Sequence, residues 1–425
     1  MHESDTLLAM DLEGAPDLGA PSGEPALATR RTARVLLVFR QRDEVAATIL
    51  RGIAHYQQSH GDWSVQIDDR PRSTAELRWQ LAQGWDGVIS RHTSQALVEA
   101  CAEFRVPLVD LDDGPRYAGV SKVRCDHAAA GAMGAECFLD RGFRSFGFVG
   151  CGEQARARER QAGFVEAVRL GGHEPLELEL EAGEWNPVRG EREGRVLAEW
   201  LQQLPKPVAV MACDDRRAAQ VLEAARAARC LVPEEVAVLG VDNDVVRCEL
   251  STPTLSSVDP GFYQVGFRAA EHLHRRLQGT HTPVCDLRVD PAGVVFRKTT
   301  DSIAIPDRAV AAAVRHIAAH GCEGLTVDAV LAEVGVSRSQ LEKKFRHYLG
   351  RSPQAEIRRV QVARVRQLLV ETDLPLKGIA ELTGYDYTEY MCVVFRRLTG
   401  ETPGAYRRRH RPRGCAAPPE HGRAA

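Results

Sequence analysis

Two sets of side chains in this 425-residue chain could recognise a partner, and they lie in different parts of the sequence. The first set is polar or aromatic and lies beside short apolar runs: Gln41, His92, Asp126, Arg160, Trp185, Asp214 and Asp242. The second set is half basic and lies near the C-terminus: Arg338, Gln340, Lys343, Lys344, Tyr387, Glu389, Tyr390 and Arg397. The first set could bind hydroxyl groups, whereas the second could bind nucleic acid.

The first set combines carboxylates with a guanidinium and an aromatic ring. Carboxylates accept and guanidinium groups donate hydrogen bonds, so together they can hold vicinal hydroxyls. An indole such as that of Trp185 can cover the apolar face of a sugar ring. Any one of these residues could instead cap a strand end or form a surface salt bridge. As a set, they favour a ligand-binding cleft.

The elements that would position this set alternate between strands and helices. Apolar runs such as Val35–Phe39 suit strands buried on both faces, and helical stretches separate them. A second series of strands and helices begins at Val123. Two such series predict parallel sheets in two lobes, with the ligand beyond the carboxyl ends of the strands.

Catalytic and metal chemistry find little support in this region. The run Phe148–Gly152 lacks the third spaced glycine and the P-loop lysine of nucleotide sites. Asp214 and Asp215 could suggest acid–base work, but no nucleophile with a base partner can be argued from spacing. Histidines are dispersed. We therefore expect no catalytic residue, no bound metal and no cofactor.

The second set lies on a helical module that is written twice, with an offset of 50 residues. In each copy a short helix, at Val327–Val334 or Leu376–Leu382, precedes a glycine-containing turn and a second helix. The expected buried stripes are Leu341, Phe345 and Leu349 in one copy and Met391, Val394, Phe395 and Leu398 in the other. This pattern predicts two helix-turn-helix units.

A helix predicted at Gln354–Val370 connects the two units. Its 17 or so residues span roughly 25 Å, which suits two reading helices in successive major grooves. The outward faces carry groups that pair with base edges and phosphates. A helical bundle with a solvated basic face is the alternative, and the duplication favours double-stranded DNA as the partner.

Charge and composition fit this division. From Asp301 onward there are 20 Lys and Arg against 14 Asp and Glu, whereas the preceding residues hold 35 against 44. Eleven scattered cysteines without a Cys-x-x-Cys pair, and no leader or membrane-length apolar run, predict a reducing cytoplasm. We expect disordered tails at residues 1–31 and 413–425, a sensor domain at 32–300 and a DNA-binding domain at 301–412.

The C-terminal region resembles the AraC-type DNA-binding domain. The resemblance rests on SRSQLEKKF, QVARVRQLL, IAELTGY and VVFRRLTGETPGAYRR, which together cover about 100 residues. It implies an all-α domain with two helix-turn-helix units joined by a long helix. Met391 stands where the family usually has an aromatic residue, and Gln361–Val362 replaces its usual Arg-Leu.

The preceding region resembles the LacI/GalR-type, periplasmic-binding-protein-like sensor domain. The phrases DHAAAGAMGAECFLDRGFRSFGFVG, RERQAGFVEAV and VAVLGVDND carry this resemblance. It implies a two-lobed α/β fold in which Asp126, Arg160, Asp214 and Asp242 touch a sugar. Asp214 replaces the family's common Asn, which removes a hydrogen-bond donor.

A LacI-type sensor before an AraC-type reader, without the sensor family's usual N-terminal DNA-binding segment, is similar to the regulators of xylose operons. The resemblance implies a homodimeric activator that responds to a pentose such as D-xylose and acts on RNA polymerase. Two alternatives stay open. The chain could be a carbohydrate carrier or enzyme with an accessory helical domain, or a DNA-binding protein whose sensor domain binds no ligand and serves for dimerisation.

Overall fold

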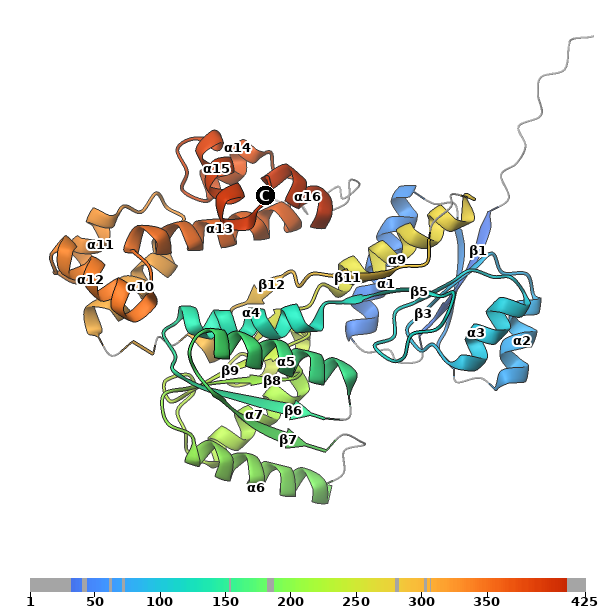
Figure 1. Ribbon diagram of the computed structural model, residues 1–425, viewed down its shortest axis with the longest axis horizontal. Helices are drawn as coiled ribbons and strands as arrows, with labels where there is room; N and C mark the ends of the chain where they lie inside the picture. Colours follow the sequence, from blue (N-terminus) through green and yellow to red (C-terminus); the bar gives the residue numbers. More distant parts are fainter. Residues whose placement is uncertain are drawn as a thin grey trace, which may run out of the picture. The chain divides into compact units, whose positions relative to one another are not determined.

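The computed structural model describes residues 32–39, 44–60, 63–70, 73–152, 154–181, 187–279, 283–301, 304–305 and 307–410. The chain folds into two α/β lobes and a helical domain that follows them in sequence, as Figure 1 shows. This confirms the expected fold class. The predicted tails, Gln41 and Trp185 lie outside the described residues.

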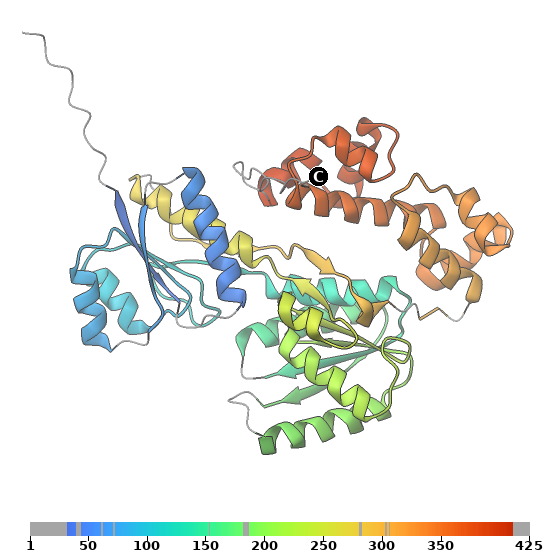
Figure 2. The ribbon, with the colours of Figure 1, turned by 180° about the vertical axis from the view of Figure 1, so that it is seen from behind.

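Lobe 1 is a parallel six-stranded sheet in the order β2-β1-β3-β4-β5-β11. Its strands are β1 (Ala33–Val38), β2 (Trp63–Asp68), β3 (Gly87–Ser90), β4 (Leu108–Asp110), β5 (Ser121–Cys125) and β11 (Asp286–Val289). Its helices are α1 (Glu44–His60), α2 (Thr74–Ala82), α3 (Gln95–Glu103) and α9 (Phe262–Leu277). Helices α1 and α9 lie side by side on one face of the sheet, as Figure 2 shows from behind.

Lobe 2 is a second six-stranded sheet, in the order β7-β6-β8-β9-β10-β12, in which only the β10–β12 pair is antiparallel. Its strands are β6 (Ser145–Cys151), β7 (Pro175–Leu180), β8 (Val208–Ala212), β9 (Val236–Val241), β10 (Ser256–Asp259) and β12 (Gly293–Val295). Its helices are α4 (His127–Asp140), α5 (Ala155–Leu170), α6 (Pro187–Gln203), α7 (Asp215–Ala227) and α8 (Val245–Leu250). Strands β6, β8 and β9 are almost wholly buried, which explains their continuous apolar sequence.

The strand that contains Val123 does not open the second sheet, and that expectation was wrong. It is β5, which pairs with β4 and with β11 in lobe 1. The chain leaves lobe 1 after Cys125, returns between β10 and α9, and crosses again between β11 and β12. Each lobe is therefore assembled from separate stretches of sequence.

The helical domain contains two hydrophobic cores, one for each helix-turn-helix unit. Its helices are α10 (Arg308–His320), α11 (Val327–Val334), α12 (Arg338–Leu349), α13 (Pro353–Glu371), α14 (Leu376–Leu382), α15 (Thr388–Thr399) and α16 (Pro403–His410). Helix α13 is one residue longer at each end than predicted, because Ser352 caps it and Pro353 occupies its first turn.

Two residues of the predicted stripes are not buried in these cores. Leu349 is only half-buried, and Leu398 is 51% exposed. Tyr406 of α16 packs against Phe395 instead, so the core of the second unit closes one turn before Leu398. Within the described part of the chain, no helix combines the length and the apolar character needed to cross a membrane.

Candidate functional site

Arg160 lies at the centre of a cluster of polar side chains, the candidate effector site. Its side chain is completely buried near the start of α5. Its Nη2 donates to Asp242 Oδ1 at 2.7 Å, its Nη1 to the carbonyl of Cys213 at 2.6 Å, and its Nε to His127 Nδ1 at 3.2 Å. Burial alone would lower the pKa of Arg160, but the Asp242 carboxylate raises it, so the guanidinium keeps its charge.

Asp242 follows β9 in a backbone conformation that side chains rarely adopt. Its φ is +112°, and that of the next residue, Asn243, is +49°. Such strain in non-glycine residues persists where the surrounding structure holds it, and it is common at ligand sites. Arg297 donates to Asn243 Oδ1 at 3.2 Å, and the Asn243 amide donates to Ser257 Oγ at 3.0 Å. These contacts fix the loop that presents Asp242 to Arg160.

His127 connects this centre to lobe 1. Its Nε2 lies 2.9 Å from Asp113 Oδ1, and Asp113 belongs to the loop after β4. Because Arg160 donates to Nδ1, the ring proton is assigned to Nε2, which donates to Asp113. Burial would raise the pKa of Asp113, but the bond to His127 and the nearby positive charges lower it to about 2.

A second contact, an ion pair, also joins the lobes. Arg124 of β5 donates to both carboxylate oxygens of Glu159 on α5 at 2.9 Å. The sequence did not single out Arg124, Glu159, His127 or Asp113. Two of them stood beside residues that it singled out, since His127 follows Asp126 and Glu159 precedes Arg160.

Asp126 and Asp214 begin the helices that point into this region. Asp126 caps α4 by accepting from the Ala129 amide at 2.9 Å, and Asp214 caps α7 by accepting from the Arg217 amide at 2.7 Å. Each therefore has the capping role that was the simpler alternative, and each retains a second carboxylate oxygen. The negative charge of Asp214 also raises the pKa of Arg160.

Asp215 is buried, and its carboxyl group is hydrogen-bonded within the protein. It is 1% exposed and accepts hydrogen bonds from Ser257 Oγ at 2.6 Å and from the Asp244 amide at 2.8 Å. Burial, together with the charge of Asp242, raises the pKa of Asp215 to about 8. Among the other predicted residues, His92 is half-buried after β3, and its amide donates to Ser90 Oγ at 3.2 Å.

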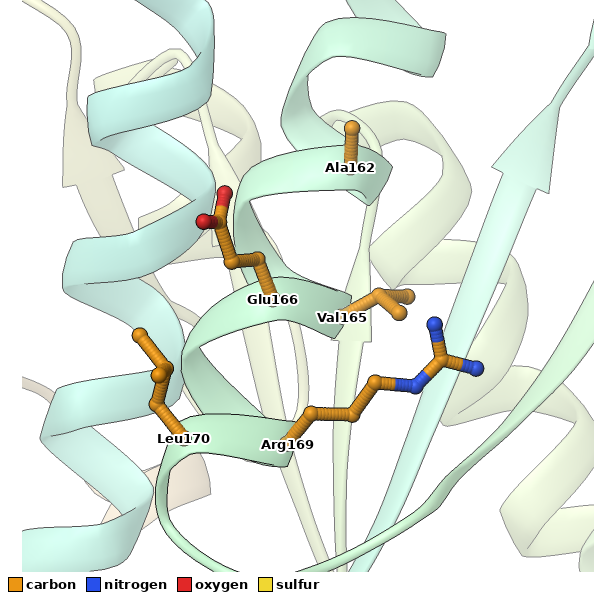
Figure 3. Close-up of a pocket in the computed structure, with 5 residues that line it drawn as sticks. All are labelled: Ala162, Val165, Glu166, Arg169 and Leu170. Atoms are coloured by element: carbon orange, nitrogen blue, oxygen red, sulfur yellow. The ribbon is translucent and has the colours of Figure 1, made fainter.

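Two surface pockets of about 440 Å³ lie away from this site. Figure 3 shows one on α5, where the apolar side chain of Leu170 is 83% exposed and flanks Glu166 and Arg169. Neither pocket includes Arg160 or Asp242. The described residues hold no cluster of three or more His, Cys, Asp or Glu suited to a metal ion.

The first candidate DNA-reading helix is α12. Ser337 and Gln340 form a capping box at its start, in which the side-chain oxygen of Gln340 accepts a hydrogen bond from the backbone amide of Ser337. Arg338 pairs with Asp328 at 2.6 Å, and Lys344 pairs with Asp307 at 2.7 Å. Lys343 is exposed and has no charged partner in the described part of the chain. Of the four predicted contacts, Lys343 is therefore the one that could bind DNA without breaking an ion pair or cap.

The second candidate reading helix is α15. Tyr387 is 71% exposed, and Glu389 and Arg397 are also exposed. Tyr390 is tied to the connecting helix, because Arg358 Nη2 of α13 donates to its hydroxyl at 2.7 Å. Arg407 donates to the carbonyls of Leu369, Thr372 and Leu374 at 3.4, 3.5 and 2.6 Å and so caps the end of α13.

Comparisons with known proteins agree with this arrangement. Residues 135–300 match the periplasmic binding protein-like domain, and residues 330–409 match a helix-turn-helix domain. The chain is 31% identical over 387 residues to the xylose operon regulatory protein of Escherichia coli K12, covering 88% of this chain and 96% of that protein. The protein of the same description from Haemophilus influenzae is 28% identical, covering 89% and 99%.

Solved structures show the same similarity. The structure of the xylose-binding transcription activator xylR matches with a TM-score of 0.56 and 29% identity, covering 89% of this chain and 98% of that chain. A complex of the regulator CelR with cellobiose matches with a TM-score of 0.52 and 25% identity, covering 64% and 85%.

A sugar-binding type of sensor fused to a pair of helix-turn-helix units defines a DNA-binding, sugar-responsive transcriptional regulator. The chain belongs to the family of xylose operon regulatory proteins. Members of this family regulate transcription and are not enzymes, so the enzyme alternative is excluded.

Proposed function

We propose that the cleft binds a pentose, D-xylose being the first candidate, and that Arg160, Asp242, Asp126 and Asp214 hold its hydroxyl groups. The observation that carries this proposal is the buried Arg160–Asp242 pair at 2.7 Å. A fixed donor and a fixed acceptor side by side match a vicinal diol, whose hydroxyls can replace the hydrogen bonds of water.

Lobe closure would make the switch. The contacts Asp113–His127 and Arg124–Glu159 both join the lobes, so any opening must break them. A sugar held by residues of both lobes stabilises the joined arrangement by its difference in affinity for the two states. His92 of lobe 1 is our candidate for the contact from the opposite side of the cleft.

Calorimetry with a panel of pentoses and hexoses tests the effector. Wild-type protein should release or absorb heat with D-xylose, and Asp242→Ala should lose it. Tight binding of a hexose but not of D-xylose would keep the sensor and replace the effector. Absence of heat with every sugar would favour a ligand-free sensor domain that serves for dimerisation.

For the helical domain we propose that α12 and α15 enter successive major grooves of double-stranded DNA. Helix α13 has 19 residues, roughly 28 Å, which approaches the roughly 34 Å turn of the duplex. Arg338, Gln340, Lys343 and Lys344 would contact the first groove, and Tyr387, Glu389, Tyr390 and Arg397 the second. Selection from a random duplex pool should return sites with two motifs about one turn apart.

We further propose a homodimer in the cytoplasm that activates transcription through RNA polymerase. The description of one relative as a transcription activator supports activation. Equilibrium sedimentation tests the dimer. Transcription in vitro with purified polymerase tests activation, since repression of the selected promoter by the sugar-bound protein would contradict it.

A further inference from the structure

Helix α4 carries cleft residues at one end and a contact with the helical domain at the other. Asp126 caps its first turn, and His127 is its first residue. Asp140 is its last residue and is 28% exposed at its side chain. The helix has 14 residues, a rod of roughly 21 Å. A displacement at the effector end therefore moves Asp140 as well.

All three oxygens of Asp140, two in the carboxylate and one in the backbone carbonyl, contact arginines of the helical domain. Arg351, at the turn before α13, donates Nη1 to Asp140 Oδ1 at 2.9 Å and Nη2 to its backbone carbonyl at 3.0 Å. Arg359, two turns into α13, places Nη1 3.0 Å from Asp140 Oδ2. The carboxylate is thus bound by two guanidinium groups that both belong to the connecting helix and its start.

Glu356 orients these two arginines within the helical domain. It is 1% exposed, pairs with Arg351 Nε, and accepts from Arg359 Nη2 at 2.8 Å. Burial would raise the pKa of Glu356, but the two arginines lower it, so it stays ionised. Because Glu356 holds both guanidiniums in place, little side-chain entropy is lost when Asp140 binds them.

The same end of α4 also holds the segment that leads into the helical domain. The Arg141 carbonyl accepts from the Ala304 amide at 3.1 Å, and Arg141 Nε donates to the Thr300 carbonyl at 3.1 Å. A Cβ on Gly142 would lie 2.7 Å from Ile305, whose side chain belongs to the core of α10 to α13. Residues 140–142 at the end of α4 therefore contact both the segment that leads into the helical domain and the arginines at the start of α13.

We propose that Asp140 is a positioning residue that docks the start of α13 on lobe 2, so that α4 transmits effector occupancy to the reading helices. It deepens the proposed function, since a sugar is the signal, but the docking itself does not depend on which sugar binds. Its partners are Arg351 and Arg359, and neither needs to touch DNA for this role.

Hydrogen exchange of the full chain without sugar tests the docking. Asp140→Asn keeps the shape of the side chain and removes its charge, and Asp140→Glu keeps the charge. We expect the Ala304 amide and the amides of residues 354–358 to exchange at least about fivefold faster in Asp140→Asn. Glu166→Gln is the control, because Glu166 is an exposed carboxylate on α5 of the same lobe (Figure 3). Unchanged exchange in Asp140→Asn would overturn the proposal.

DNA affinity with and without D-xylose tests the transmission. Couplings between sites commonly change affinity about 5- to 150-fold. In Asp140→Asn the ratio of the two DNA affinities should fall towards one, Asp140→Glu should restore part of it, and the calorimetric affinity for D-xylose without DNA should stay within about twofold of wild type. A ratio equal to that of wild type would refute transmission through Asp140. If wild type fails to bind D-xylose, the effector proposal fails, whereas the exchange result still decides the docking.

Discussion

The backbone of Gly131 in α4 touches the backbone of Arg160 in α5. A Cβ on Gly131 would lie 1.9 Å from the Arg160 carbonyl oxygen and 2.9 Å from the Phe164 amide nitrogen. The approach is reciprocal, because a Cβ on Gly163 would lie 2.0 Å from the Ala128 carbonyl oxygen. Two glycines therefore set the distance between the helix that begins with His127 and the helix that carries Arg160.

Gly131→Ala should push the two helices apart. Overpacking of this kind costs typically about 1–3 kcal/mol, and the displaced Arg160 should also bind sugar less tightly. Gly194→Ala in α6 is the matched control, because its Cβ would meet open space and should stabilise the chain by about 0.4–1 kcal/mol. Urea unfolding measures both, and equal stability of the two variants would contradict the close contact.

Asp215→Asn should change how stability depends on pH. Burial and the charge of Asp242 raise the pKa of the wild-type carboxyl to about 8 in the folded chain, against 3.8 for an unperturbed aspartate. Between these values the unfolded chain ionises while the folded chain holds the proton, so stability is lost as pH rises. Asn keeps the shape and does not ionise.

The advantage of Asp215→Asn over wild type should therefore grow with pH, by as much as about 1.4 kcal/mol per pH unit. Chemical denaturation at pH values from 5 to 8 measures it. Parallel stability curves for the two proteins would show that Asp215 is ionised in the folded chain.

Arg160→Lys should abolish tight sugar binding although it keeps the charge. A lysine cannot reproduce the three directed hydrogen bonds to Asp242, Cys213 and His127. Each bond to a charged group contributes about 1.5–3 kcal/mol, so we expect at least a tenfold loss of affinity by calorimetry. Arg158→Lys, on the exposed side of the same helix, should bind as wild type does. Wild-type affinity in Arg160→Lys would remove Arg160 from the site.

Lys343→Ala should weaken binding to every duplex by a similar factor and lower the salt slope by about one, as expected for a phosphate contact. Arg338→Ala should instead cost about 1–3 kcal/mol at the selected site alone if Arg338 reads a base. Its exposed pair with Asp328 opposes this little, because such pairs contribute about 0–1 kcal/mol. Fluorescence anisotropy over a salt series separates the two. Uniform weakening by Arg338→Ala would make Arg338 a phosphate contact.

The helical domain could be predicted closely because its signals are local. Helices α11 and α14 begin and end where the periodicity and turn residues placed them. Strand β5 could not be assigned in the same way, because its partner β11 lies about 160 residues further along the chain. Leu398 has the helical spacing of a buried residue, but Tyr406 of α16 packs against Phe395 and leaves Leu398 exposed.

The candidate cleft was predictable in part. Arg160 and Asp242 follow from their places beside strands, and the structure brings them together. Asp113 and Glu159 meet their partners only across the two lobes, and no spacing in the sequence indicates a contact between separate lobes.

The crossing of the chain between the lobes also sets an order for synthesis on the ribosome. Lobe 1 begins first, but its α9 and β11 are translated only after most of lobe 2, which then lacks only β12 and the residues 296–300 that follow it. Lobe 1 therefore cannot complete its core until most of lobe 2 has been translated, and until then the apolar face that α9 covers stays exposed. Nascent chains halted before Phe262 should consequently depend on chaperones more than chains halted after Val295.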